Sequence, residues 1–167
     1  LERRLGTRVH VENDAVLGAW GEYRAGAGQR HSDFIYVKVS HGIGAGLVIG
    51  GQIYHGGTGL AGEIGHTQLP GRSELCRCGR LGCLEAAVSV ESVRQQILHS
   101  HPRQDADFVI AELNDFITDR ILNEAGRTVG RVLADLCNLL NPTALIIGGQ
   151  LGTAGASLID GVRASIR

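Results

Sequence analysis

The chain has 167 residues, of which 43% are apolar and 20% are charged, and its formal net charge is −1. This composition is ordinary for a globular domain, and the charge gives no electrostatic reason to expect nucleic-acid or membrane binding by this segment. Four cysteines are too few for a secreted disulfide scaffold, and the first residues lack the apolar stretch of a signal peptide, so a cytoplasmic location is expected. No apolar run is long enough to cross a bilayer. The chain contains no methionine, and we therefore expect it to be a piece of a longer protein.

The first 56 residues alternate between helical and extended patterns. In chain order they predict the end of a helix at 1–6, a short strand at 8–13, a helix at 14–28, a strand at 33–40, a glycine-rich turn at 41–46 and a second strand region at 47–56. The pair Gly50-Gly51 inside the last of these segments is typical of a two-residue hairpin turn.

Residues 56–85 have little periodicity and contain eight glycines. A long irregular stretch in a compact domain is usually functional or cross-linked. The pattern becomes helical from Ala86, and Ser89 is a good N-cap for a helix that ends before Pro102. The remaining segments are one or two helices in 105–141, a buried strand at 143–150 and a helix at 156–167. Because strands and helices alternate in this order, the predicted class is α/β.

Three of the four cysteines, Cys76, Cys78 and Cys83, fall within eight positions. Zinc takes four nitrogen or sulfur ligands in a tetrahedron, so the cluster predicts a structural zinc site with a histidine as the fourth ligand. His66 lies ten residues before Cys76, and His55 is the competing candidate. Such a site would staple a stretch that has few apolar residues of its own.

Two other interpretations of the cysteine cluster are weaker. Free core thiols are disfavoured because Glu74, Arg77 and Arg80 lie among the cysteines. A disulfide across a spacing of one residue has uncomfortable geometry. The fourth cysteine, Cys137, lies on an apolar helix face and is interpreted as a buried structural thiol.

Four segments of the chain together resemble the motifs of one family. They are VENDA (11–15), AGEIGHT (61–67), CRCGRLGCLE (76–85) and NLLNPTALIIGG (138–149). The third resembles the C-x-C-G-x-x-G-C-x-E signature of the ROK family, which comprises repressors, open reading frames and sugar kinases, and the other three follow that family's order. The stretch 33–67 is more similar to the actinobacterial repressors of the family than to its glucokinases.

The resemblance implies an actin-like, RNase H-like sugar-kinase fold, with two α/β lobes and the sugar in the cleft. The chain is similar to the C-terminal, sugar-binding lobe together with the end of the first crossover. Residues 1–167 are therefore expected to form a single fragment with a zinc-stapled loop. The N-terminal lobe with its D-x-G-G-T phosphate loop, and the winged helix-turn-helix of repressor members, are expected to lie outside this chain.

The resemblance assigns five positions to sugar contacts: Asn13, Asp14, Glu63, His66 and Glu85. Carboxylates, amides and imidazole suit a ligand that presents a fan of hydroxyls, because an unpaired buried polar group costs about 1–3 kcal/mol. In kinase members the aspartate that matches Asp14 is the general base. His66 would bind zinc through one ring nitrogen and donate to the sugar through the other. Simpler roles are an N-cap for Asp14, solvated loop carboxylates for Glu63 and Glu85, and a surface histidine for His66.

The chain departs from kinase members at three positions. Ser40 and His41 replace a glycine and a threonine in the turn that holds ATP phosphates, and Val16 replaces the second asparagine of E-N-D-A-N. In a kinase, ATP and Mg²⁺ would be cofactors in addition to zinc. The phosphate-binding glycines would then be Gly42, Gly44, Gly46, Gly148 and Gly149.

The favoured function is a sugar-sensing effector domain of a ROK transcriptional regulator, in which bound sugar biases the DNA-binding heads of a homo-oligomer, a dimer or tetramer. Operator DNA would be bound through a domain outside this chain, and no membrane partner is expected. The alternative is an ATP-dependent, glucokinase-like sugar kinase with Asp14 as base. A third class, a zinc-stapled structural module without a ligand, would leave the polar positions without a purpose.

Overall fold

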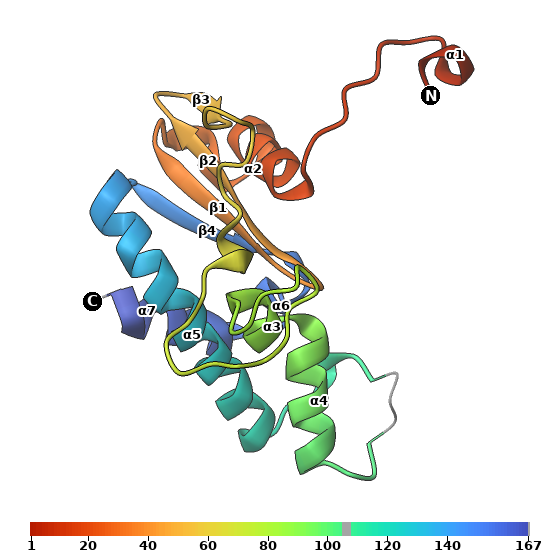
Figure 1. Cartoon of the computed structure of the whole chain (residues 1–167), viewed down its shortest axis with the longest axis vertical. Coiled ribbons are helices and arrows are strands. Elements are labelled where there is room, and N and C mark those ends of the chain that lie inside the picture. The colour runs from red at the N-terminus through yellow and green to blue at the C-terminus, as the bar shows by residue number, and fades with distance from the viewer. Residues whose placement is uncertain (105–107, 167) are drawn as a thin grey trace.

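The computed structural model describes residues 1–104 and 108–166, and within them it contains one four-stranded sheet of order β3-β2-β1-β4 (Figure 1). The strands are β1 (Phe34–Val39), β2 (Ile43–Ile49), β3 (Gln52–Tyr54) and β4 (Ala144–Gly148). β2 is antiparallel to both β1 and β3, whereas β4 runs parallel to β1. The parallel pair is joined through helices, which confirms the predicted α/β class.

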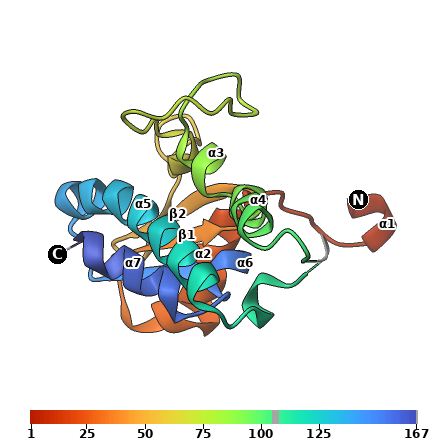
Figure 2. The same cartoon turned by 90° about the horizontal axis from the view of Figure 1, so that it is seen from below.

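Helices cover both faces of the sheet. They are α1 (Glu2–Leu5), α2 (Asp14–Ala25), α3 (Leu84–Val88), α4 (Val90–Ser100), α5 (Phe116–Leu140), α6 (Gly149–Gly152) and α7 (Ala156–Ile166), with short 3-10 turns at Ala27–Arg30, Ile64–His66 and Ile110–Glu112. α2 packs on one face, and α5 and α7 lie side by side beneath the other (Figures 1 and 2). α1 stands away from the sheet at the end of an extended segment (Figure 1).

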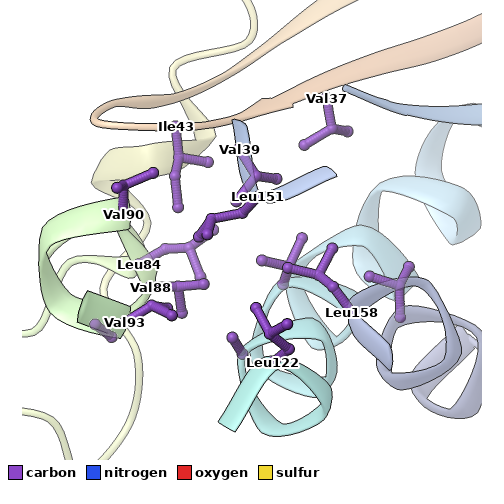
Figure 3. Packing of buried hydrophobic residues seen from close by; sticks show 14 of the residues in the cluster. Val37, Val39, Ile43, Leu84, Val88, Val90, Val93, Leu122, Leu151 and Leu158 are labelled. Carbon is purple, nitrogen blue, oxygen red and sulfur yellow. The ribbon is translucent and has the colours of Figure 1, made fainter. Parts of the chain in front are cut away.

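The alternation of side chains along β1 explains the two unequal cores. Ile35, Val37 and Val39 point to the side of α5 and belong to the large apolar core, whereas Phe34 belongs to a small cluster under α2. In Figure 3, Val37 and Val39 extend from the sheet toward the helices that carry Leu84, Leu122 and Leu158. The large core therefore fixes the sheet on α3, α5 and α7, and the face under α2 holds fewer apolar residues.

The approach of α2 to β2 depends on Gly46 and is also close at Gly44, two glycines of the predicted phosphate turn. A Cβ atom at Gly46 would lie 2.4 Å from the Cβ of Ala19, and one at Gly44 would lie 3.2 Å from the Cβ of Ala15. Real Cβ atoms do not approach closer than about 3.0 Å. Because α2 carries the predicted sugar residues at its first turn, this close packing sets the distance between them and the sheet.

Several local signals in the sequence are confirmed. Gly50 and Gly51 have φ values of 58° and 75° and connect β2 to β3, as the hairpin pattern predicts. Ser89 is the N-cap of α4, where its hydroxyl accepts a hydrogen bond from the Ser92 N–H at 3.3 Å. The predicted strand at 143–150 and helix at 156–167 correspond to β4 and α7.

Other predictions about local structure were wrong or need adjustment. Residues 8–13 form no strand, because no described strand lies beside them to accept their backbone hydrogen bonds. The turn predicted at 41–46 ends earlier, and β2 begins at Ile43. In 105–141 the structure has a 3-10 turn and α5, while 105–107 lie outside the described residues. Cys137 is only partly buried.

Among the described residues, no helix combines the length and the apolar character that a bilayer crossing requires.

Candidate sugar pocket and metal centre

A polar pocket of about 420 Å³ opens where the first turn of α2, the β1–β2 turn and α3 meet. Its lining residues are Asn13, Asp14, Lys38, His41, Gly42, Ile43, Gly44, Glu63, His66, Arg77 and Glu85. All five positions predicted to contact a sugar are in this set. The structure therefore brings together residues that are up to 72 positions apart in the chain, from Asn13 to Glu85.

The first turn of α2 contributes an amide and a carboxylate to the pocket. Asn13, and not Asp14, is the N-cap, because the Asn13 Oδ1 accepts a hydrogen bond from the Ala15 N–H at 2.8 Å. The Asn13 Nδ2 is then directed at Glu63, whose Oε1 it meets at 3.4 Å. Asp14 is the first helical residue, and its Oδ2 forms an ion pair with the Nζ of Lys38. The interpretation of Asp14 as a mere N-cap was wrong.

Glu85 is a buried carboxylate in α3 and not a solvated loop residue. The Arg77 guanidinium contacts both carboxylate oxygens, with Nε 2.6 Å from Oε1 and Nη2 3.1 Å from Oε2. The Ile43 N–H also donates to Oε2 at 3.0 Å. These contacts connect the cysteine segment, α3 and the start of β2 on one wall of the pocket.

The three clustered cysteines and His66 form a compact group. Their ligand atoms all lie within 4.8 Å of one another. The Cys78 and Cys83 sulfurs are 3.7 Å apart, and the Cys76 sulfur is 3.8 Å from the His66 Nδ1. A tetrahedral zinc site with metal–sulfur bonds of about 2.3 Å has edges of about 3.8 Å, so the donor set and its spacing fit such an ion. The group can hold a metal.

The cluster selects between the two histidines considered for it. His66 presents Nδ1 to the sulfurs, so its Nε2 remains for the pocket that the same ring lines. His55 is not in the group, and its Nδ1 lies 3.6 Å from the Glu12 carboxylate. The role of His66 as a plain surface histidine was therefore wrong, since its ring is half-buried between the cysteines and the pocket.

The thiols of the cluster differ in environment. Cys76 and Cys83 are buried, whereas Cys78 is exposed at the tip of the turn. Burial raises the pKa of the Cys83 thiol to about 11, and the hydrogen bond from the Arg80 backbone N–H lowers the pKa of Cys78. A metal bound here would coordinate thiolates, and its positive charge would offset the cost of ionising Cys83.

Two of the five glycines proposed for nucleotide phosphates line the pocket. Gly42 and Gly44 line the pocket, whereas Gly46 lies farther along β2 against α2. Gly148 ends β4 and Gly149 begins α6, and neither is a pocket residue. A nucleotide site in this chain would have to extend beyond the pocket described here.

Sequence reasoning missed two pocket residues, Lys38 and Arg77. Lys38 is the only charged residue in the strand Phe34–Val39, and a lone charge in an apolar strand is the signal that marks it. Its side chain is on the α2 face of the sheet, where it reaches Asp14. Arg77 gave no local signal beyond its place between two cysteines.

The fold and the pocket define the class of protein. A mixed sheet with helices on both faces, and a polar pocket at the first turn of α2, are the features of an actin-like ATPase fold of the sugar-kinase type. The ROK family model matches residues 1–167, and the chain belongs to the ROK family.

Relatives of both functional kinds are similar to this chain. A glucokinase of Streptomyces coelicolor is 33% identical over the whole chain, and the DNA-binding transcriptional repressor Mlc of Escherichia coli is also 33% identical over the whole chain. The chain spans 59% of the length of the glucokinase and 44% of that of the repressor.

Solved structures give the same division. A Streptomyces griseus ROK glucokinase in complex with glucose and AMPPNP superposes with a TM-score of 0.87 at 34% identity, covering 98% of this chain and 59% of that one. A ROK transcriptional regulator, a homologue of the E. coli Mlc protein, superposes with a TM-score of 0.86 at 28% identity, covering 99% of this chain and 45% of that one. The family contains sugar kinases and regulators, and overall similarity does not separate them for this chain.

Proposed function

We propose that this chain is the sugar-binding, C-terminal lobe of a ROK-type transcriptional regulator. In this proposal Asn13, Asp14, Glu63, His66 and Glu85 contact the hydroxyls of an unphosphorylated sugar. The support is their convergence on one pocket that offers an amide, an imidazole and three carboxylates. Such a set can donate to and accept from each hydroxyl of a sugar, which keeps buried polar groups paired.

The observation that carries the choice of regulator over kinase is His41, which lines the pocket at the position where kinase members have a small threonine for the phosphates. Asp14 does not separate the two functions, because the ion pair with Lys38 uses only its Oδ2 and a general base needs one carboxylate oxygen for the hydroxyl proton. Ser40 and Val16 are further departures from the kinase pattern.

The alternative function is an ATP-dependent sugar kinase of glucokinase type. It is supported by the presence of Asp14 at the mouth of the pocket and by the glucokinase relatives. In that case Mg²⁺-ATP would approach from the side of Gly42 and Gly44, and Asp14 would accept the hydroxyl proton on the oxygen that Lys38 does not contact.

A kinase assay on the complete protein that contains this chain separates the two functions. With ATP, Mg²⁺ and glucose or xylose, the regulator proposal expects no turnover above background. Robust phosphorylation that disappears in Asp14→Asn would contradict it and support the kinase. The purified protein can also be used to select an operator fragment from genomic DNA. Release of this fragment when sugar is added is the positive result that the regulator proposal requires.

Zinc is the metal that we assign to the cysteine cluster. Its ligands would be His66 Nδ1 and the sulfurs of Cys76, Cys78 and Cys83, which leaves no open coordination position. The role of a closed site is structural: it would hold the loop and fix the His66 ring so that Nε2 faces the sugar. Catalysis by the metal is not part of the proposal.

Metal analysis of protein purified without chelators should give about one equivalent of zinc per chain. His66→Ala should lose both metal and sugar binding, whereas His55→Ala should keep both. A zinc content near zero in the unmodified protein, or loss of only one of the two properties in His66→Ala, would contradict the shared role of this histidine.

The rest of the regulator proposal concerns the complete protein. Operator DNA would bind to a domain outside this chain, and the protein would act in the cytoplasm as a homo-oligomer. A sugar can shift such an assembly only by binding its two conformations with different affinities. Light scattering with and without sugar, combined with DNA-binding curves, tests this part directly.

A further inference from the structure

The Arg77–Glu85 pair is unusual in the exposure of its two members. The Glu85 side chain is 7% exposed, whereas the Arg77 side chain is 70% exposed. The carboxylate therefore depends on its partners for hydrogen bonds, while the guanidinium has water on most sides. If the pair separates, water can solvate the exposed Arg77 guanidinium, whereas the buried Glu85 carboxylate needs other hydrogen-bond donors.

The hydrogen-bonding capacity of Glu85 is nearly used. A carboxylate has about four lone-pair positions, and three are taken by the Arg77 Nε, the Arg77 Nη2 and the Ile43 N–H. A sugar that donates two neighbouring hydroxyls to Glu85 needs positions that the guanidinium holds. The sugar and Arg77 therefore compete for the same oxygens.

The β1–β2 turn is shaped to receive this pair. A Cβ atom at Gly42 would lie 2.9 Å from the Arg77 Nη2 and 3.2 Å from the Glu85 Oε2. Any other residue at this position would press on the ion pair. The absence of a side chain at Gly42 thus provides the space in which Arg77 reaches Glu85 inside the pocket.

We infer that Arg77 is a built-in competitor of the ligand: its guanidinium occupies Glu85 until a sugar displaces it, and so it determines the affinity of the pocket. This inference rests on the proposed sugar-binding function. When sugar binds, two hydroxyls replace the guanidinium on the buried carboxylate, and Arg77 moves into water. The buried carboxylate keeps hydrogen-bond donors in both states, because two hydroxyls replace two N–H groups of the guanidinium.

The exchange of Arg77 for sugar at Glu85 requires movement of one side chain and not of the backbone. Arg77 lies in the turn between Cys76 and Cys78, where the Cys76 N–H donates to the Arg80 carbonyl at 2.8 Å. The backbone of this turn is fixed by that bond and by the cysteine cluster, so the exchange needs only rotation of the Arg77 side chain. The long exposed stem of an arginine permits such a rotation.

Calorimetric titration of the complete protein with D-glucose and, separately, D-xylose tests the inference. Arg77→Met should bind the sugar that the unmodified protein prefers roughly three- to tenfold more tightly, because the competing ion pair is gone. Arg77→Lys, which keeps the charge but not the bidentate geometry, should fall between the two. Arg80→Met is the matched control, since it removes a charge from the same turn. Among the described residues, the Arg80 side chain forms no ion pair with a carboxylate. The sugar affinity of Arg80→Met should equal that of the unmodified protein.

Ionic strength gives a second measurement that a purely structural role would not affect. The sugars are uncharged, so salt acts on their binding only through charged groups of the protein. Screening of the exposed guanidinium should strengthen binding to the unmodified protein as salt rises, and this dependence should be smaller in Arg77→Met.

The outcomes separate this inference from the function on which it rests. Weaker or unchanged binding in Arg77→Met, in a variant whose folding is verified by circular dichroism, shows that Arg77 helps to bind the sugar or is neutral, and overturns the inference alone. Binding that is seen only in Arg77→Met supports it strongly. The absence of sugar binding in every variant overturns the proposed function and the inference together.

Discussion

The helical layer beneath the sheet and the cysteine loop, residues 67–83, are stabilised in different ways. In the layer, Val129 and Leu133 of α5 and Leu158 of α7 are completely buried. In the loop, Leu75 is 73% exposed, and the buried residues are Cys76, Gly82 and Cys83. Hydrophobic burial holds the first region. The second has backbone hydrogen bonds, two isolated bridges and a group of metal-ligating atoms.

The difference teaches that the pocket has two walls with separate origins. Asn13, Asp14 and Lys38 come from α2 and the sheet, which fold around apolar cores. His66 and Arg77 are placed by the cysteine cluster and its turn. A change in the core should therefore lower global stability and leave the metal in place, and a change in the cluster should do the opposite. Two predictions test this separation, and a third concerns the pH dependence of stability at the start of α5.

The largest effect is expected in the core. Leu133→Ala should lower the free energy of unfolding by about 3 kcal/mol, because the lost methyl groups leave a cavity between α5 and its neighbours. Urea denaturation followed by circular dichroism measures this change. Leu139→Ala, at a position of the same helix that is 78% exposed, is the control and should stay within about 0.5 kcal/mol. Loss of metal from folded Leu133→Ala would contradict the separation.

A smaller effect on global stability is expected at the cluster. Cys78→Ser removes one metal ligand at an exposed position, so the metal content should fall well below one equivalent, and the free energy of unfolding should fall by less than in Leu133→Ala. Trypsin should then cut more rapidly after the exposed Arg72 and Arg80 of the freed loop. Cys137→Ser, a control outside the cluster, should keep its metal content and its resistance to trypsin. A large drop in global stability in Cys78→Ser would show that the two walls are coupled.

The smallest effect concerns pH and the start of α5. Hydrogen bonds from the Thr118 hydroxyl and backbone lower the pKa of Asp115, the N-cap of this helix, below its ordinary value of 3.8. The stability that this carboxylate provides is therefore complete above pH 3.8 and is lost as the pH falls through that value toward the folded-state pKa. Asp115→Asn keeps a cap but not the charge, so acid unfolding curves should show a weaker pH dependence. An identical pH dependence of stability in both proteins would show that the Asp115 carboxylate does not contribute to it.

The sequence predicted those features that a short segment specifies. The turn at Gly50-Gly51 and the cap at Ser89 follow from local backbone chemistry. The spacing of the three clustered cysteines is enough to predict a candidate metal site. The strand expected at 8–13 failed because alternation of side chains says nothing about whether a partner strand is present. The large core was predictable in kind, since β1 and α5 carry strong apolar patterns.

The two cations of the pocket were beyond sequence reasoning for a different reason. Lys38 meets a carboxylate 24 positions away on another element, and Arg77 meets one across the turn of the cysteine segment. Nothing in either local pattern specifies the partner, because both pairs depend on how α2 and α3 approach the sheet. Sequence motifs predicted the carboxylates of the site but not the two cations that form ion pairs with them.

The tight packing of α2 on Gly46 has a consequence for interpreting the glycine-rich segment of this pocket. Gly46 is one of the glycines that a kinase would use for phosphates, yet the neighbouring helix already requires it, since a Cβ atom would lie 2.4 Å from the Ala19 Cβ and 2.6 Å from the Ala15 carbonyl oxygen. A relative that does not bind ATP would still need this glycine to keep the helix on the sheet. The presence of Gly46 therefore reflects helix packing and is not by itself a sign of phosphate binding.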